Sequence, residues 1–183
     1  MKKLSRTGVF IDAANFEISL KQCGLRANYK KLLKWLSQDG KVTLLRYYGP
    51  SFNTEGQNRF FTFLKKRGFK IVTKDIKIIK QHEKQSKHKA NFDVEIAVDA
   101  FNYINKYDEF ILFSGNSDFV YLASKLQERN IKVIVISPHW RTARELRSKA
   151  DQFMDLRNCE FVEKIKRLPF GSAHDNLSTA KKV

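Results

Sequence analysis

Three aspartates in this sequence stand next to short apolar segments, where acidic side chains can carry out chemistry. Asp12 directly follows the apolar run 7–11, and Asp118 closes a polar turn after a second apolar run at 110–113. Asp93 begins a segment with helical spacing that leads toward that second run. Three carboxylates that meet at one place bind a hard divalent cation through oxygen. Such an ion can convert water to hydroxide and neutralise charge that develops on a phosphate.

Each carboxylate also has a structural interpretation. Asp93 and Asp118 begin predicted helices, where Asp commonly caps the first turn. Asp12 is harder to explain this way, because a carboxylate beside a buried strand is costly unless a partner such as Asn15 faces back toward it. Asp99 follows Asp93 by six residues. That spacing is a rotation of about 600°, so the two do not share a helix face. We therefore interpret Asp99 as a supporting residue or a surface charge rather than a metal ligand.

The elements that must position these side chains alternate between strands and helices. Apolar runs predict strands at 7–11, 42–48, 69–73, 110–113, 132–136 and 153–156. Helical spacing predicts helices at 13–22, 29–36, 57–66, 93–101, 118–129 and 142–149, the fourth burying Val94, Ala97, Val98 and Phe101. This alternation predicts an α/β fold, doubly wound and Rossmann-like, with a mostly parallel central sheet of about five or six strands and helices on both faces. In such folds, functional residues collect at the carboxyl ends of the strands.

The charge of the chain predicts its class of partner. It has 35 Lys and Arg residues against 19 Asp and Glu, a net charge of +16. This excess favours polyanions, with nucleic acid first and an anionic membrane surface second. Residues 74–91 are rich in lysine, and we interpret them as an exposed, mobile basic loop that leads into Asp93. Its expected phosphate contacts are Lys84, Lys87 and Lys89.

Two further groups of residues are candidates for nucleic-acid binding. Arg141, Arg144 and Arg147 recur every three residues along one predicted helix flank and could contact phosphates. Tyr48 and Phe52, near the end of the second strand, could stack on bases. A solvated charge run and an ordinary surface helix would show the same basic patterns.

Other familiar sites have no counterpart in the sequence. Two cysteines, Cys23 and Cys159, cannot build a structural zinc site and suit a reducing, cytoplasmic setting. The four histidines include no i, i+4 pair, and there is no nucleophile elbow, P-loop or dinucleotide-binding glycine motif. No segment approaches the roughly 18 apolar residues of a membrane span, so we expect no membrane insertion. The chain turns polar at 169–183, which we expect to be a flexible tail after a domain at 1–168.

Three segments resemble the motifs of NYN domains, a PIN-like nuclease family that includes the LabA-like proteins. They are VFIDAANF at 9–16, KANFDVEIAVDA at 89–100 and SGNSDF at 114–119. The later segments IKVIV at 131–135, ELR at 145–147 and ADQF at 150–153 are similar to the family's usual ending. The resemblance covers about residues 7–156 in the expected order.

The resemblance implies a PIN-like fold and a Mg²⁺- or Mn²⁺-dependent nuclease site, with RNA, single-stranded or structured, as the usual substrate. Asp12, Asp93 and Asp118 match acidic positions of the family motifs, and Asp99 matches the second acid of its motif. Position 116 is Asn where the family usually has Asp. Asn116 still offers a neutral carbonyl oxygen as a metal contact, but it removes one negative charge and should weaken the metal.

Two hypotheses of different classes follow. The first is a metal-dependent ribonuclease in which Asp12, Asp93 and Asp118 hold the ion, Asn116 adds a weak contact, and Asn15, Asp99 and Ser114 support them. The second is a non-catalytic RNA-binding or regulatory module on the same fold, which Asn116 favours. A small-molecule phosphohydrolase is a weaker third, because the D-x-D pattern expected after the first strand is absent. The sequence also leaves a homodimer open.

Overall fold

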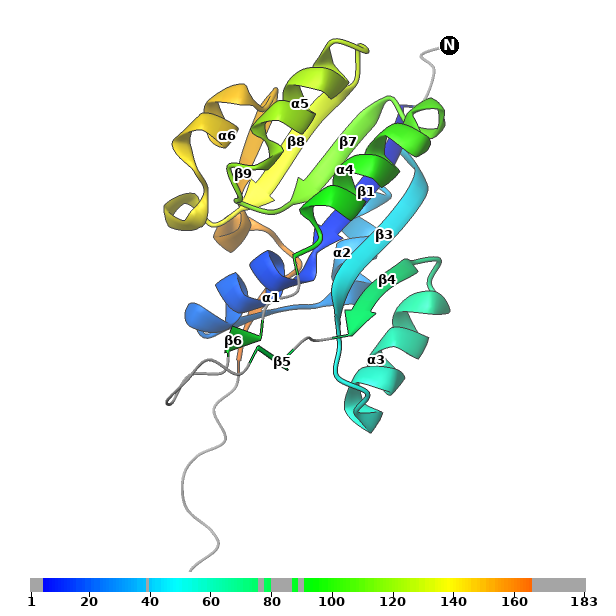
Figure 1. Ribbon diagram of the computed structural model, residues 1–183, viewed down its shortest axis with the longest axis vertical. Coiled ribbons are helices and arrows are strands. Elements are labelled where there is room, and N and C mark those ends of the chain that lie inside the picture. The colour runs from blue at the N-terminus through cyan, green and yellow to red at the C-terminus, as the bar shows by residue number, and fades with distance from the viewer. Residues whose placement is uncertain (1–4, 39, 76–77, 80–86, 89–90, 166–183) are drawn as a thin grey trace, which may run out of the picture.

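A six-stranded parallel sheet forms the centre of the computed structural model, which describes residues 5–38, 40–75, 78–79, 87–88 and 91–165 (Figure 1). Its strands, in spatial order, are β4 (Lys70–Asp75), β3 (Lys41–Ser51), β1 (Arg6–Asp12), β7 (Glu109–Phe113), β8 (Lys132–Ser137) and β9 (Gln152–Asp155). The helices are α1 (Ala13–Gln22), α2 (Tyr29–Leu36), α3 (Glu55–Lys65), α4 (Asp93–Asn102), α5 (Phe119–Gln127) and α6 (Arg144–Lys149). The predicted doubly wound α/β fold is confirmed.

The order of the strands indicates where along the sheet a ligand site is expected. From β1 the chain moves outward through β3 to β4, then crosses to the other side of β1 and continues through β7, β8 and β9. β1 and β7 therefore flank the point at which the strand order reverses. The crevice outside the carboxyl ends of two such strands is the usual ligand site of an open α/β sheet. Asp12 ends β1, and Ser114 follows β7.

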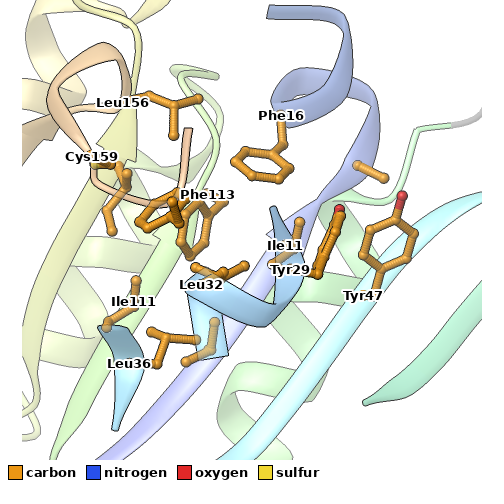
Figure 2. Close-up of a cluster of buried hydrophobic side chains, with 14 of the residues drawn as sticks. Ile11, Phe16, Tyr29, Leu32, Leu36, Tyr47, Ile111, Phe113, Leu156 and Cys159 are labelled. Carbon is orange, nitrogen blue, oxygen red and sulfur yellow. The ribbon is translucent and has the colours of Figure 1, made fainter. Parts of the chain in front are cut away.

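Alternation along the strands divides the core into two layers. Val9 and Ile11 face a cluster that includes residues of α1, α2 and α3, whereas Phe10 faces a second cluster with residues of α4, α5 and α6. Figure 2 shows the first cluster, in which Phe16 and Phe113 meet edge to face with their ring centroids 5.1 Å apart. Because both faces are covered, the strands are continuous apolar runs, as expected for parallel sheets.

The prediction for the buried face of α4 is wrong. Val94, Val98 and Phe101 are 71%, 53% and 38% exposed, and Ala97 is half-buried. The helix instead buries Ile96 and Ala100 against the sheet. Both stripes have helical spacing, but only the second lies on the same face as Asp93, which sits one turn before Ile96. Contacts of the acidic side chains, described below, select this orientation.

Several short segments escaped sequence prediction. β2 (Leu25–Ala27) pairs antiparallel with β10 (Val162–Lys164), and β5 (Ile78–Ile79) pairs antiparallel with β6 (Lys87–His88). Residues 74–75 belong to β4, so the segment 74–91 is not a loop throughout, although most of it lies outside the described residues. Three 3₁₀ turns, η1 (Ile104–Lys106), η2 (His139–Arg141) and η3 (Leu156–Asn158), complete the described elements.

The predicted tail at 169–183 lies outside the described residues, and the domain limit at 168 stays a prediction. Within the described part of the chain, no helix has both the length and the apolar character needed to cross a bilayer.

Candidate active site

Asp12 is fixed by hydrogen bonds from two turns. It ends β1 and occupies the N-cap of α1, with only 4% of its surface exposed. Its carboxylate accepts from the Asn15 backbone N (3.3 Å), from the Asn15 side-chain amide and from the Ser114 hydroxyl (3.0 Å). Burial raises the pKa of Asp12, and the hydrogen bonds from Asn15 and Ser114 oppose that rise. Partners on both sides therefore hold this carboxylate in one orientation.

Asn116, in the turn after β7, bridges the other two aspartates. Its side-chain nitrogen donates to Asp93 Oδ2 at 2.9 Å and to Asp118 Oδ2 at 3.2 Å. Its Oδ1 accepts from the Asp118 backbone N at 3.3 Å, which determines which end of the amide faces the carboxylates. The Asn116 backbone N donates to Ser114 Oγ at 3.3 Å, so one hydroxyl contacts both Asp12 and this turn. A donor group thus stands where a cation shared by Asp93 and Asp118 would lie.

Neither Asp93 nor Asp118 caps a helix through its side chain. The N-cap of α4 is Phe92, which makes no side-chain capping bond, and the Asp93 backbone N donates to Asn91 Oδ1 at 2.8 Å. Asp118 occupies the N-cap of α5 without a side-chain capping bond. The capping interpretation of these two residues therefore does not describe their contacts. Of the three aspartates, Asp12 is the one whose side chain accepts a capping bond.

The three aspartates share one electrostatic environment. Partial burial raises the pKa of Asp93, the hydrogen bond from Asn91 opposes this, and the charges of Asp12 and Asp118 raise it further. As the side chains stand, no three His, Cys, Asp or Glu residues of the described segments are grouped closely enough to hold one ion. The oxygen donors suit Mg²⁺ or Mn²⁺. An ion bound to Asp93 Oδ2 and Asp118 Oδ2 would take the place of the two hydrogen bonds from the Asn116 amide.

Comparison with known proteins decides the family. The model of the NYN domain matches residues 6–157. The chain belongs to the NYN domain family. It is 30% identical over 175 residues to the "Low amplitude and bright protein LabA" of Synechococcus elongatus, covering 92% of this chain and 94% of that protein. The crystal structure of a protein of unknown function, VPA0982 from Vibrio parahaemolyticus, has the same fold, with a TM-score of 0.71 and 24% identity over 84% of this chain and 93% of that one.

Membership in the NYN family places the chain in the PIN-like nuclease superfamily, whose members generally use divalent metals and interact with nucleic acid. The resemblance expected from the three sequence motifs is confirmed. One aspartate of each motif lies at the carboxyl edge of β1 and β7: Asp12 ends β1, Asp118 follows β7, and Asp93, whose carboxylate accepts from Asn116, begins α4.

Asp99 has a separate partner in this NYN domain. Its Oδ2 accepts from Arg46 Nη2 and, at 2.9 Å, from the Tyr48 hydroxyl. Arg46 is buried in β3, and its guanidinium lies over the Tyr103 ring at 4.8 Å. Asp99 therefore neutralises a buried cation and ties α4 to β3. This contact orients α4 and, with it, Asp93.

Lys74 joins the start of α4 to the edge strand β4. Its Nζ donates to the Asn91 carbonyl at 2.8 Å and pairs with Glu95 Oε1 at 2.5 Å. Lys74 lies over the Phe92 ring, 5.1 Å from its centroid. Because the Asn91 side chain accepts from the Asp93 backbone, Lys74 acts on the residues that position Asp93. Sequence analysis assigned Lys74 only to a basic run, and its partners lie about 20 residues away on a different element.

The predicted basic contacts fall into two groups. Lys84 and Lys89 lie outside the described residues, and Lys87 is described only as part of the β6 backbone. Arg141 and Arg144 are exposed, and Arg141 donates to the Gln22 side chain at the end of α1. Arg141 belongs to η2, whereas α6 begins at Arg144, so the predicted single helix flank is wrong. The peptide bends between these residues because Thr142 adopts an extended backbone.

The two aromatic residues predicted to stack on bases differ in exposure. Phe52 is 57% exposed and is available for contact. Tyr48 is completely buried, stacks on Phe10 and donates its hydroxyl to Asp99, so its predicted role in stacking is wrong. Alternation along β3 turns Tyr48 into the core, while its hydroxyl satisfies a buried carboxylate.

Proposed function

We propose that this NYN domain is a metal-dependent ribonuclease. The observation that supports it is the position of Asp12, a buried carboxylate fixed by Asn15 and Ser114 at the strand-order reversal, with Asp93 and Asp118 in the same electrostatic environment. A Mg²⁺ or Mn²⁺ ion at these aspartates would activate water for attack on a phosphodiester. Asp12, whose orientation is fixed, would position that ion, and Asp93 and Asp118 would be its other ligands.

The charge of the protein supports RNA as the substrate. The aspartates lie on a chain with a net charge of +16, and exposed Arg141 and Arg144 follow β8 at the same edge of the sheet. Basic side chains would hold phosphates while the ion neutralises the phosphate under attack. We also propose that the protein is cytoplasmic and that it forms a homodimer. Sedimentation of the purified chain tests the homodimer.

Cleavage of labelled RNA with Mn²⁺ by wild type and Asp12→Asn tests the proposal. Asp12→Asn keeps the shape of the side chain but removes its charge, so we expect the activity to fall by at least about a hundredfold, the scale of one lost electrostatic contribution to catalysis. Glu128→Gln, an equal change of charge at the exposed C-cap of α5, should leave the rate unchanged. Equal cleavage by wild type and Asp12→Asn would reject the role of Asp12.

The second candidate is a non-catalytic RNA-binding module, and the contacts of Asn116 favour it. Its amide already satisfies Asp93 and Asp118 without a metal. This alternative expects RNA binding with a steep dependence on salt and no turnover with any divalent metal. Measurement of binding in EDTA beside cleavage in Mn²⁺ separates the two functions.

A further inference from the structure

An exposed tryptophan lies at the carboxyl edge of the sheet, outside the aspartate site. Trp140 belongs to η2, directly after β8, and 49% of its surface is exposed. The guanidinium of Arg157, in η3 after β9, lies over its ring, 4.6 Å from the centroid. A large aromatic ring at the surface with a planar cation on one face is suited to stacking against a flat ligand.

Hydrogen bonds hold the Arg157 guanidinium in place. Asp155 accepts from the Arg157 backbone N at 3.0 Å, from Nε at 3.2 Å and from Nη2 at 2.7 Å. The Asp155 side chain is only 14% exposed, and the pKa of this carboxyl is lowered by Arg157. These bonds use the edge of the guanidinium and leave its plane against Trp140. The ring is therefore ordered before a ligand arrives, which lowers the entropic cost of binding.

The position of Trp140 relates it to the aspartates. Its turn packs on the loop after β7, because the Ala143 backbone N donates to the Gly115 carbonyl at 3.0 Å. β1 and β8 are separated by β7 alone, a distance of about 10 Å at the usual strand spacing. Arg141 contacts Gln22 at the far end of α1, whose first turn begins after Asp12 and whose length is about 15 Å. In Figure 1 the turn after β8 and the start of α1 lie at the same end of the sheet.

Other exposed aromatic residues lack this construction. Tyr121 is 72% exposed, but its neighbouring cation is Lys125, whose ammonium is not planar and is paired with Glu128. Phe52 is exposed without a cation over its ring among the described contacts. At the stacked rise of about 3.4 Å per nucleotide, 10–15 Å corresponds to about three or four nucleotides. A strand with its phosphodiester at Asp12 would thus bring a nearby base to Trp140.

We propose that Trp140, backed by Arg157, stacks on an unpaired base of a single-stranded nucleic acid whose backbone crosses the aspartate edge. Exposed Arg141 and Arg144 contact the phosphates beside that base. This inference rests on the proposed function, since it assumes that the aspartate edge binds nucleic acid. It adds a substrate class: single-stranded rather than paired, because a base within a duplex cannot offer its face to a side chain.

Intrinsic fluorescence provides the test, because the chain has only two tryptophans. In a Trp35→Phe background, Trp140 is the sole tryptophan, and titration with a single-stranded oligouridylate in EDTA should quench it. Trp140→Ala, measured by fluorescence anisotropy of a labelled oligouridylate, should bind about 5- to 150-fold more weakly, the range for one lost base stack. The salt dependence should not change, whereas Arg144→Ala should weaken binding and reduce the salt slope by about one.

Controls separate stacking from a loss of structure. Trp140→Phe keeps a ring and should retain most of the affinity, and Arg157→Lys keeps the charge but loses the planar contact and should bind more weakly. Phe101→Ala, which removes a 38%-exposed ring from α4, should bind like wild type. A hairpin duplex should bind the wild type and Trp140→Ala equally.

The outcomes distinguish this inference from the proposed function. Oligouridylate binding that is equal in wild type and Trp140→Ala, without quenching, overturns the stacking role and leaves the nuclease proposal standing. A wild-type protein that binds no nucleic acid overturns both. Three results together support the stacking site on a non-catalytic module: quenching of Trp140 in the Trp35→Phe background, weaker binding by Trp140→Ala, and no cleavage by wild type in Mn²⁺.

Discussion

Asn116→Asp tests the central feature of the site, an amide that bridges two carboxylates. The substitution restores the acid that the family usually has at this position, but it removes the donors to Asp93 and Asp118. A hydrogen bond to a charged group contributes about 1.5–3 kcal/mol, and we count only the bond to half-buried Asp93 because Asp118 is exposed. Repulsion between carboxylates about 4 Å apart adds ~1 kcal/mol in water, and more where burial lowers the dielectric.

The expected result without metal is a loss of stability. The two contributions together give about 2.5–4 kcal/mol, or roughly 5–16 °C in melting temperature for a chain of this size. The new carboxylate should raise the pKa of Asp93 beyond the rise that burial already causes. A carboxyl whose pKa is raised on folding destabilises the protein above that pKa, so the deficit should shrink as the pH falls toward about 4.

Thermal unfolding followed by circular dichroism, in EDTA and in excess Mn²⁺, measures this effect. Mn²⁺ should restore much of the lost stability of Asn116→Asp and should stabilise the wild type less, since ligand binding adds to stability according to affinity. Asn116→Ala is the matched control, because it removes the same donors without supplying a ligand, so Mn²⁺ should rescue it less than it rescues Asn116→Asp. The reasoning is refuted if Asn116→Asp melts like wild type in EDTA. It is also refuted if Mn²⁺ stabilises Asn116→Asp and Asn116→Ala equally.

Three other substitutions test the support of the site, each by urea unfolding. Asp99→Asn should lower the free energy of unfolding by about 3 kcal/mol, because it leaves the buried cation of Arg46 unpaired; wild-type stability in this variant would contradict the ion pair. Gly115→Ala should cost at least about 1–3 kcal/mol, because a Cβ there would lie 2.4 Å from a backbone oxygen, whereas Gly56→Ala enters open space and should not destabilise. Glu17 lies in α1 and accepts a hydrogen bond from the Tyr29 hydroxyl at 2.5 Å. Burial raises the pKa of Glu17, so its contribution to wild-type stability should decline as the pH rises through that pKa. Glu17→Gln should remove this decline. If the free energy of unfolding of Glu17→Gln has the same pH profile as that of wild type, the assignment to Glu17 is wrong.

The fold was predictable because its strands are buried on both faces. Such strands are continuous apolar runs, and helices alternate with them, so the six central strands could be located within a few residues. β2 and β10 escaped prediction because each has three residues and they pair across most of the chain. No local pattern of hydrophobicity records a pairing of that kind.

The site was less predictable than the fold, because the decisive information lies in partners from distant elements. The spacing of Asp12 and Asn15 is local, so the sequence could suggest their contact. The buried face of α4 could not be chosen from spacing alone, since both stripes fit a helix. Arg46 decides it through Asp99, and a charged residue inside the apolar run 42–48 was the available signal.

The choice between the two functions depends on the competition between the Asn116 amide and a cation. The amide satisfies Asp93 and Asp118 without charge, so an ion must replace two hydrogen bonds as well as shed its own water. The donors to Asp12 come from two other elements, Asn15 of α1 and Ser114 after β7, and they hold this carboxylate in one orientation. A nuclease therefore needs a metal affinity that exceeds the cost of turning Asn116, whereas a binding module needs none. Measured Mn²⁺ affinities of wild type and Asn116→Asp consequently bear on function directly. Binding by both proteins, tighter in the variant, supports the ribonuclease, whereas binding by the variant alone favours the module.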